Sequence, residues 1–329
     1  EGNGTDAVCY GSGANATGKF TTAIGANSSA ATSSSTASLG STAVGYGANA
    51  SAANSASFAR NSLATGNRAT AIGSFSKATL NASTAVGFQA NASGLRSHAI
   101  GSYSNSTGEA TLAAGYQSKA TSNRTTAIGG YANASSNAGT AVGYNSTSSG
   151  FRATAIGTRA NSSGNQSIAI GYDASASDKN TVSIGYQSNA AGINSIALGY
   201  SANSQGGNST ALGFSAKSAG RNSTAVGLLA SAAGNDSVSV GKSSQATSQG
   251  STAYGHLARA QAARTIAIGA GSISNKTCAI AIGQFSRATA LNATAIGTNV
   301  SVSGQNGIAI GSEANAGGEN STGVGTFAA

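Results

Sequence analysis

A short motif of a small residue, an aliphatic residue and glycine recurs through the chain, as in Ala71-Ile72-Gly73. Its glycine returns every fourteen residues, at Gly45 and then from Gly73 to Gly325, and Ala59 is the one exception in phase. A short repeat at a fixed period is the sequence signature of a solenoid, in which each repeat forms one coil. The pattern therefore predicts a stack of fourteen-residue coils.

Positions within the repeat are numbered from the motif glycine, which is position 0. Position −1 is almost always Ile, Val or Leu, and position −3 is usually Thr, Ile or Val, as in Ile168 and Ile170. This alternation of β-branched residues predicts a strand, and we expect these aliphatic side chains to face the interior of the coil. Ala or Ser at +3 and +5, as in Ala132 and Ala134, predicts a second short strand with its small side chains inward.

Position +7 is often glycine, which favours a tight corner with a positive φ. The clearest cases are Gly94, Gly150, Gly192 and Gly220. Two strands and two turns in each repeat predict an all-β, single-stranded parallel β-solenoid with coils about 4.8 Å apart. One thin coil buries too little apolar surface to offset the backbone entropy, so we expect several chains to pack as a symmetric homo-oligomer.

The repeat predicts one continuous domain over residues 1–329. Gly25 and Gly45 are twenty residues apart, which predicts a loop insertion near residues 32–37. Only 8% of the 329 residues are charged, and Pro is absent although Gly occurs 47 times. This composition excludes collagen and leaves few acid–base groups for an enzyme, so we expect no catalytic residues, no cofactor and no metal. No apolar run is long enough to span a bilayer, so we expect no membrane insertion.

Units such as Asn222-Ser223-Thr224-Ala225-Val226-Gly227, followed by Ala or Ser at +3 and +5, recur in register along nearly the whole chain. They resemble the YadA-like head domain of trimeric autotransporter adhesins. The resemblance implies a left-handed parallel β-roll, a homotrimeric rod, display on the cell surface and adhesion to host matrix or other cells. From it we expect a non-enzymatic extracellular protein that attaches multivalently to cells, matrix proteins or glycans. The alternative is a structural subunit of an extracellular fibre or sheath that polymerises end to end.

The formal charge of +9 comes from 17 basic and 8 acidic residues. Arginine occupies position −5 in alternate coils, and aromatic residues occupy +2 in the same coils, so these residues form a candidate interaction face for anionic glycans. The face consists of Arg68, Arg96, Arg124, Arg152, Phe75, Tyr103 and Tyr131. Duplication together with packing between chains is the alternative explanation of this pattern. Basic residues are too sparse here to indicate nucleic-acid binding.

A second aromatic series, Tyr172, Tyr186, Tyr200 and Phe214, occupies one position in consecutive coils and predicts a stack of rings. Asn-x-Ser/Thr sequons are also frequent, and their outward phase favours glycosylation. The candidate sites are Asn49, Asn91, Asn133 and Asn161 at +4, and Asn208, Asn222 and Asn320 at −5. The repeat itself creates some sequons, because Asn favours turns and Ser or Thr follows two residues later.

The two cysteines, Cys9 and Cys278, lie nearly twenty coils apart in the sequence. At about 4.8 Å for each coil, a disulfide between them within one chain is impossible. Both are candidates for an intermolecular disulfide, either around a symmetry axis or between rods, and free or buried thiols are the alternative.

Overall fold

The computed structural model describes residues 4–32 and 40–328, and these residues contain no helix. Each coil has a three-residue strand at positions −3 to −1, a turn, a second strand that begins at +4, and a second turn; the second strand has two residues, except in the first two coils, where it has three. The chain divides into two compact units, Glu1–Gln166 and Ser167–Ala329. The expectation of an all-β solenoid of short coils is confirmed.

Two columns of strands make up each unit, one of the strands at −3 to −1 and one of the strands that begin at +4. The first column of unit 1 contains β1 (Val8–Tyr10), β3 (Thr22–Ile24), β5 (Thr42–Val44), β7 (Ala56–Phe58), β9 (Thr70–Ile72), β11 (Thr84–Val86), β13 (His98–Ile100), β15 (Leu112–Ala114), β17 (Thr126–Ile128), β19 (Thr140–Val142) and β21 (Thr154–Ile156). Its second column contains β2 (Asn15–Thr17), β4 (Ser29–Ala31), β6 (Asn49–Ala50), β8 (Leu63–Ala64), β10 (Lys77–Ala78), β12 (Asn91–Ala92), β14 (Asn105–Ser106), β16 (Lys119–Ala120), β18 (Asn133–Ala134), β20 (Thr147–Ser148) and β22 (Asn161–Ser162).

Unit 2 repeats this arrangement. Its first column contains β23 (Ile168–Ile170), β25 (Val182–Ile184), β27 (Ile196–Leu198), β29 (Thr210–Leu212), β31 (Thr224–Val226), β33 (Val238–Val240), β35 (Thr252–Tyr254), β37 (Ile266–Ile268), β39 (Ile280–Ile282), β41 (Thr294–Ile296), β43 (Ile308–Ile310) and β45 (Thr322–Val324). Its second column contains β24 (Ser175–Ala176), β26 (Asn189–Ala190), β28 (Asn203–Ser204), β30 (Lys217–Ser218), β32 (Ser231–Ala232), β34 (Gln245–Ala246), β36 (Arg259–Ala260), β38 (Ile273–Ser274), β40 (Arg287–Ala288), β42 (Ser301–Val302) and β44 (Asn315–Ala316).

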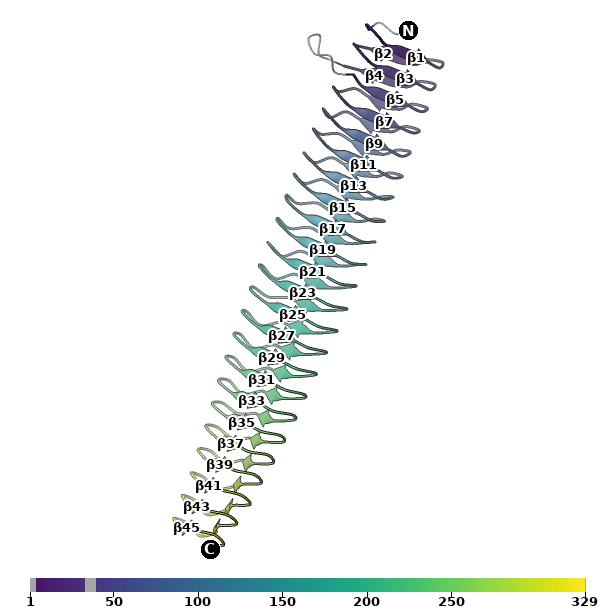
Figure 1. Cartoon of the computed structure of the whole chain (residues 1–329). Coiled ribbons are helices and arrows are strands. Elements are labelled where there is room, and N and C mark those ends of the chain that lie inside the picture. The colour runs from purple at the N-terminus through teal and green to yellow at the C-terminus, as the bar shows by residue number, and fades with distance from the viewer. Residues whose placement is uncertain (1–3, 33–39, 329) are drawn as a thin grey trace. The chain divides into compact units, whose positions relative to one another are not determined.

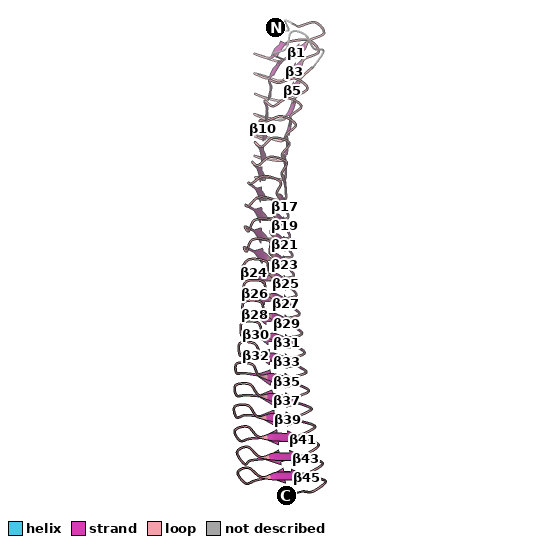
Figure 2. Ribbon diagram, turned by 90° about the vertical axis from the view of Figure 1, so that its left-hand side faces the viewer, coloured by secondary structure: helices cyan, strands magenta, loops and turns pink. Residues whose placement is uncertain are grey.

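Successive coils pair in parallel and in register, so equivalent positions stack directly along each unit (Figure 1). For example, β9 pairs with β11 through Thr70↔Thr84 and Ile72↔Val86. Viewed from the side, the first-column strands of each unit lie above one another, with turns on either side (Figure 2). β3 pairs with β5 through Thr22↔Thr42, a spacing of twenty residues. The loop insertion predicted near 32–37 falls almost wholly on residues 33–39, which lie outside the described residues.

Side chains at −4, −2, +3 and +5 fill the interior of each coil; they are small in almost every coil, and Val300 and Val302 are the largest of them. In one coil these are Ala69, Ala71, Ser76 and Ala78, and each is 0% exposed. The inward orientation predicted for +3 and +5 is confirmed. Most buried hydroxyl groups bond within the coil, as between Ser57 Oγ and Ser62 Oγ at 2.7 Å, which removes most of the cost of burying them, whereas Ser76 Oγ has no partner among the described residues.

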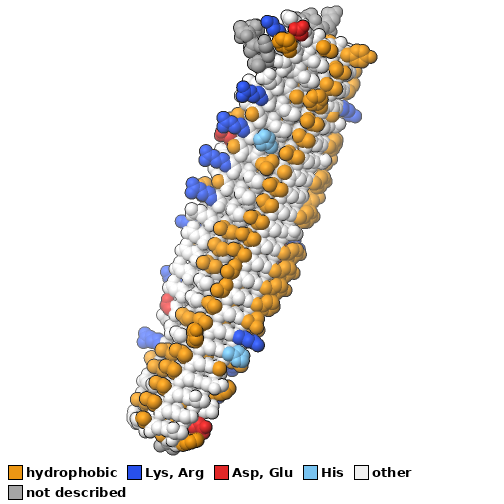
Figure 3. Space-filling view, viewed as in Figure 1, with side chains coloured by type: hydrophobic (Ala, Val, Ile, Leu, Met, Phe, Trp, Pro, Cys, Tyr) orange, Lys and Arg blue, Asp and Glu red, His pale blue; other side chains and the backbone are white. Residues whose placement is uncertain are grey.

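The aliphatic side chains at −1 and −3 point outward, so the prediction that they fill the interior was wrong. Ile72 and Ile100, both at −1, are 42% and 44% exposed, whereas Ala71, at −2 of the same strand as Ile72, is buried. A strand presents alternate side chains to opposite faces, and a coil of fourteen residues has room inside for Ala or Ser but not for two Ile. Hydrophobic side chains consequently form rows along the surface (Figure 3).

Glycine at +7 serves close approach of the backbone and not the positive φ that the sequence suggested. A Cβ at Gly94 would overlap the carbonyl oxygen of Gly108 in the next coil. The motif glycine needs both properties, because Gly73 has φ +125° and its Cβ would lie 2.5 Å from Gly87 O. Positions −5 and +2 also have positive φ, yet residues such as Arg68 (59°) and Phe75 (60°) occupy them.

Candidate functional site

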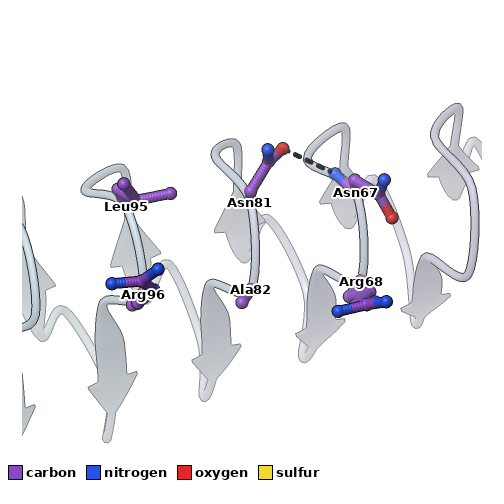
Figure 4. Close-up of a pocket in the computed structure, with 6 residues that line it drawn as sticks. All are labelled: Asn67, Arg68, Asn81, Ala82, Leu95 and Arg96. Atoms are coloured by element: carbon purple, nitrogen blue, oxygen red, sulfur yellow. Dashed lines mark hydrogen bonds between the residues drawn. The ribbon is translucent and has the colours of Figure 1, made fainter.

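The predicted arginines lie in the turn that precedes the three-residue strand, and all four are exposed. We call Arg68, Arg96, Arg124 and Arg152 the arginine row. Alanine occupies the same position in the coils between them, so the row has gaps. One hollow of about 210 Å³ lies over Ala82 between Arg68 and Arg96, with Leu95 at its edge (Figure 4). Figure 4 also shows the bond from Asn67 N to Asn81 Oδ1, 3.2 Å long, which joins two coils beside this hollow.

A second hollow of about 230 Å³ lies over Ala138, between Arg124 and Arg152. Glu109 and Phe151 also line it, and Arg152 Cζ stands 4.9 Å from the centre of the Phe151 ring. Basic side chains are seen to project along one edge of the molecule (Figure 3). Two guanidinium groups on either side of a small gap can hold a carboxylate or sulfate group.

The predicted aromatic partners of the arginines lie in the other turn of each coil, between the three-residue and two-residue strands. Phe75 is seven residues, or half a coil, from Arg68, and the same holds for Tyr103 and Tyr131 relative to their arginines. The structure therefore does not bring the two sets together on one face. The cation that Phe75 does meet is Arg60, whose Cζ lies 5.1 Å from the centre of the ring.

The aromatic residues of unit 1 instead form a ladder with their neighbours in adjacent coils. Ring centres along Phe75, Phe88, Tyr103, Tyr116, Tyr131 and Tyr144 are 5.3–6.2 Å apart, with interplanar angles of 79–88°. Partial desolvation of its phenol, and then the charges of the Tyr116 and Tyr144 phenolates, raise the pKa of Tyr131, with a further contribution from its hydrogen bond to Tyr116.

The aromatic series predicted in unit 2 has a different geometry. Tyr172, Tyr186, Tyr200 and Phe214 are stacked with ring centres 4.8–5.1 Å apart and interplanar angles of 4–9°, so this predicted stack is confirmed. In such a stack the faces of the inner rings cover each other.

Two further hollows beside the unit 1 ladder were missed by the reasoning from sequence. One of about 410 Å³ is lined by Phe75, Lys77, Gln89 and Asn91. The other, about 240 Å³, is lined by Gln117, Lys119, Tyr131, Asn133, Asn145 and Thr147. All ten residues occupy position +2 or +4. The sequence did contain a signal for these two hollows, namely the alternation of aromatic and amide residues at +2.

The candidate glycosylation sites occupy two outward positions. Asn49, Asn91, Asn133 and Asn161 lie on two-residue strands, whereas Asn208, Asn222 and Asn320 lie in exposed turns. The turn asparagines bond from coil to coil, as from Asn208 Nδ2 to Asn222 Oδ1 at 3.1 Å, and Asn222 Nδ2 donates to Asp236 Oδ1 at 2.9 Å. Glycosylation of these sites stays a prediction.

Cys9 lies at the inward position −2 of β1, and its Sγ donates to Ala14 O at 3.0 Å. Cys278 lies in a turn of unit 2 with φ 58°. Their intermolecular disulfide stays a prediction. Within residues 4–32 and 40–328, no cluster of three or more His, Cys, Asp or Glu side chains is placed to hold a metal ion. Across the same residues, the structure has no helix of the length and apolarity needed to cross a bilayer.

The repeat matches the family model described as the YadA head domain repeat. Matches cover residues 3–38 and 39–56, and overlapping matches then cover 60–104, 106–272, 279–299 and 303–328. The chain belongs to the YadA head repeat family. Recognition of this family from the hexapeptide units is thereby confirmed.

A search of solved structures finds similarity between this YadA head repeat chain and the collagen-binding domain of the Yersinia adhesin YadA. The two are 23% identical, the match covers 58% of this chain and 68% of that chain, and the TM-score is 0.20. The search of curated proteins found no match.

Proposed function

We propose that this chain is the head of an extracellular, non-enzymatic surface protein that acts as a homotrimer and attaches multivalently to matrix or cell surfaces. The observation that carries the proposal is the match of YadA head repeats along almost the entire chain. The fold provides what such a role needs, because equivalent side chains repeat in rows, and many weak contacts in a row add up to a firm attachment.

The outward aliphatic residues at −1 support the homotrimer. In unit 1 alone, Ile72, Ile100, Ile128 and Ile156 are each 39–44% exposed on one chain. Covering each half-exposed Ile gains roughly 1 kcal/mol, and a contiguous apolar row of this kind marks an interface. Copies of the same chain, related by an axis along the coils, present identical rows to one another.

The arginine row supports attachment to anionic groups. Arg68 and Arg96 flank one hollow, and Arg124 and Arg152 flank the next, so a gap between two arginines occurs twice along unit 1, although Glu109 also lines the second. Unit 1 carries nine basic and three acidic residues, against eight and five in unit 2, which gives formal charges of +6 and +3. Attachment through such exposed charges weakens as salt rises.

The test measures the oligomeric state of the purified chain and its attachment to surfaces coated with collagen or heparin. A triple variant, Arg68→Ala, Arg96→Ala and Arg124→Ala, is compared with a control that also loses three exposed cations, Lys217→Ala, Arg259→Ala and Arg287→Ala. We expect a trimer that attaches to at least one surface, and about a tenfold loss for the first variant alone.

Equal losses in both variants would contradict the role of the arginine row. A monomer that attaches to neither surface would refute the proposed function. Growth of the purified protein into long filaments would instead support the alternative of a fibre or sheath subunit.

A further inference from the structure

Position +2 of six consecutive coils in unit 1 alternates between an aromatic and an amide side chain. The residues are Phe75, Gln89, Tyr103, Gln117, Tyr131 and Asn145, which we call the aromatic–amide row. Every one has a φ of 52–60°, so the turn holds all six in the same backbone conformation and their side chains leave the coil alike. The aromatic residues thus recur every second coil, about 9.6 Å apart at the usual strand spacing.

A polar row runs beside it at position +4. It consists of Lys77, Asn91, Asn105, Lys119, Asn133 and Thr147. The two hollows of about 410 and 240 Å³ lie between these two rows, one at each end of the series. Asn91 Nδ2 donates to Asn105 Oδ1 at 2.8 Å, which fixes two neighbouring amides of the polar row. We call the surface strip between the two rows, which is hollowed at each end, the groove; it runs across coils 73 to 143, named by their motif glycines.

The rings of this ladder meet edge to face and not face to face, unlike those in unit 2. Tyr103 and Tyr131 are 43% and 42% exposed, and their neighbours meet them at 79–85°. Edge-to-face contact covers less of the ring faces than parallel stacking does. Tyr186 is also 42% exposed, but parallel rings lie against both of its faces.

The charges of the groove are all positive. Lys77 and Lys119 are exposed, and no residue of either row is Asp or Glu. The remaining polar groups are amides, the hydroxyl of Thr147 and the phenols of Tyr103 and Tyr131, which donate and accept hydrogen bonds without charge. Aromatic faces with amides between them suit sugar rings, which have apolar faces and hydroxyl edges, and the two lysines favour sugars that carry carboxylates.

We propose that this groove binds an extended, β-linked acidic polysaccharide, with one disaccharide for every two coils. One sugar of each pair stacks on Phe75, Tyr103 or Tyr131, and the next bonds to the amide in the following coil. Two coils are about as long as two pyranose rings in an extended chain. The proposal names a ligand class for the attachment function proposed above and rests on it, but it uses the turn opposite the arginine row.

The experiment measures binding of hyaluronan oligosaccharides of increasing length to the full chain by titration calorimetry, with chitin oligosaccharides as the neutral arm. We expect a hexasaccharide, which reaches all three rings, to bind more tightly than a tetrasaccharide, and hyaluronan more tightly than chitin. Tyr131→Ala should lower the affinity about fivefold, whereas Tyr186→Ala, with equal exposure but in the stacked series, should leave it unchanged. Gln117→Leu should also lower the affinity for hyaluronan, because it removes an amide of the aromatic–amide row and leaves every aromatic ring in place.

Equal effects of Tyr131→Ala and Tyr186→Ala, or no dependence on length, would overturn the groove. Chitin binding as tightly as hyaluronan would overturn the preference for acidic sugars. Native protein that carries glycans on both Asn91 and Asn133 would also overturn it, because those glycans would fill the groove. Dissociation of the oligomer by Gln117→Leu would show that the row is an interface between chains. If the native chain binds no hyaluronan but still attaches to the coated surfaces, the groove fails while the proposed function stands.

Discussion

Two adjacent glycines in one turn of unit 2 give a sharp test of how closely the coils approach. A Cβ at Gly206 would overlap the carbonyl group of Gly220 in the next coil, whereas a Cβ at Gly207 would meet nothing nearer than Ile193 O at 3.9 Å. Neither glycine has a positive φ, so Ala is compatible with both backbones. The contrast between Gly206→Ala and Gly207→Ala therefore isolates steric contact between coils.

The size of the contrast follows from what can move. The coil cannot shift at Gly206, because its N–H bonds to Ser218 O at 3.4 Å and its carbonyl accepts from Ser209 Oγ at 2.6 Å. Forcing a methyl group into such packing costs about 1–3 kcal/mol. Gly207→Ala should gain about 0.4–1 kcal/mol, because Ala has fewer unfolded conformations than Gly. Gly206→Ala shares this gain, so we expect the two variants to differ by the steric cost alone, roughly 1–3 kcal/mol in the free energy of unfolding.

Urea unfolding measures this difference, and amide hydrogen exchange in β28, β29 and β30 shows whether the loss is local, since coils of a solenoid are coupled mainly to their neighbours. Equal stability of the two variants would refute the reasoning, because it would mean that the spacing between coils adapts to a methyl group at no cost.

Three further predictions concern packing, titration and assembly. Val302→Ala should destabilise the chain by roughly 2 kcal/mol, because it leaves a cavity in the interior. Adding Gly307→Ala should recover part of this loss, because a Cβ at Gly307, 2.9 Å from Val302 Cγ1, would occupy part of the vacated space. A double-mutant cycle measures the coupling between the two substitutions. Because the pKa of Tyr131 is raised above 10.0 in the folded chain, the unfolded chain loses this proton first, and stability falls as the pH rises above that value. An absorbance titration of the native chain should contain one ionisation step, above pH 10.0, that is absent from the titration of Tyr131→Phe. Tyr116→Phe should lower the pKa of Tyr131. Ile128→Asp should dissociate the proposed homotrimer in sedimentation while the coil stays folded, because Ile128 points outward.

The period and the strands could be predicted from the sequence because both are local. The fourteen-residue spacing of the glycines fixes the register, and β-branched residues at −3 and −1 mark one strand in every coil. Ala or Ser at +3 and +5 indicated the inward side of the second strand correctly, because the alternating polar residue, such as Asn133, can only face water.

The orientation of the first strand was predicted wrongly because hydrophobicity alone does not choose between the two faces of a strand. Ile72 is the more hydrophobic side chain, yet Ala71 is inside, since the volume of the coil decides. The better signal is size: positions −4, −2, +3 and +5 all carry small residues, as expected of a cavity with one fixed width. The large aliphatic residues face a surface that the isolated chain leaves open.

The same volume argument explains where specific function can lie in this fold. Interior positions are restricted to small residues and the motif glycine to one conformation, so neither can vary much without opening the coil. The outward positions carry no such restriction, and because coils stack in register, any change repeated along them becomes a row. The fold tolerates either ladder equally, edge-to-face from Phe75 or stacked from Tyr172. The alternation of aromatic and amide residues at +2 is therefore not required for folding, and the proposed ligand with a matching two-coil repeat would account for it.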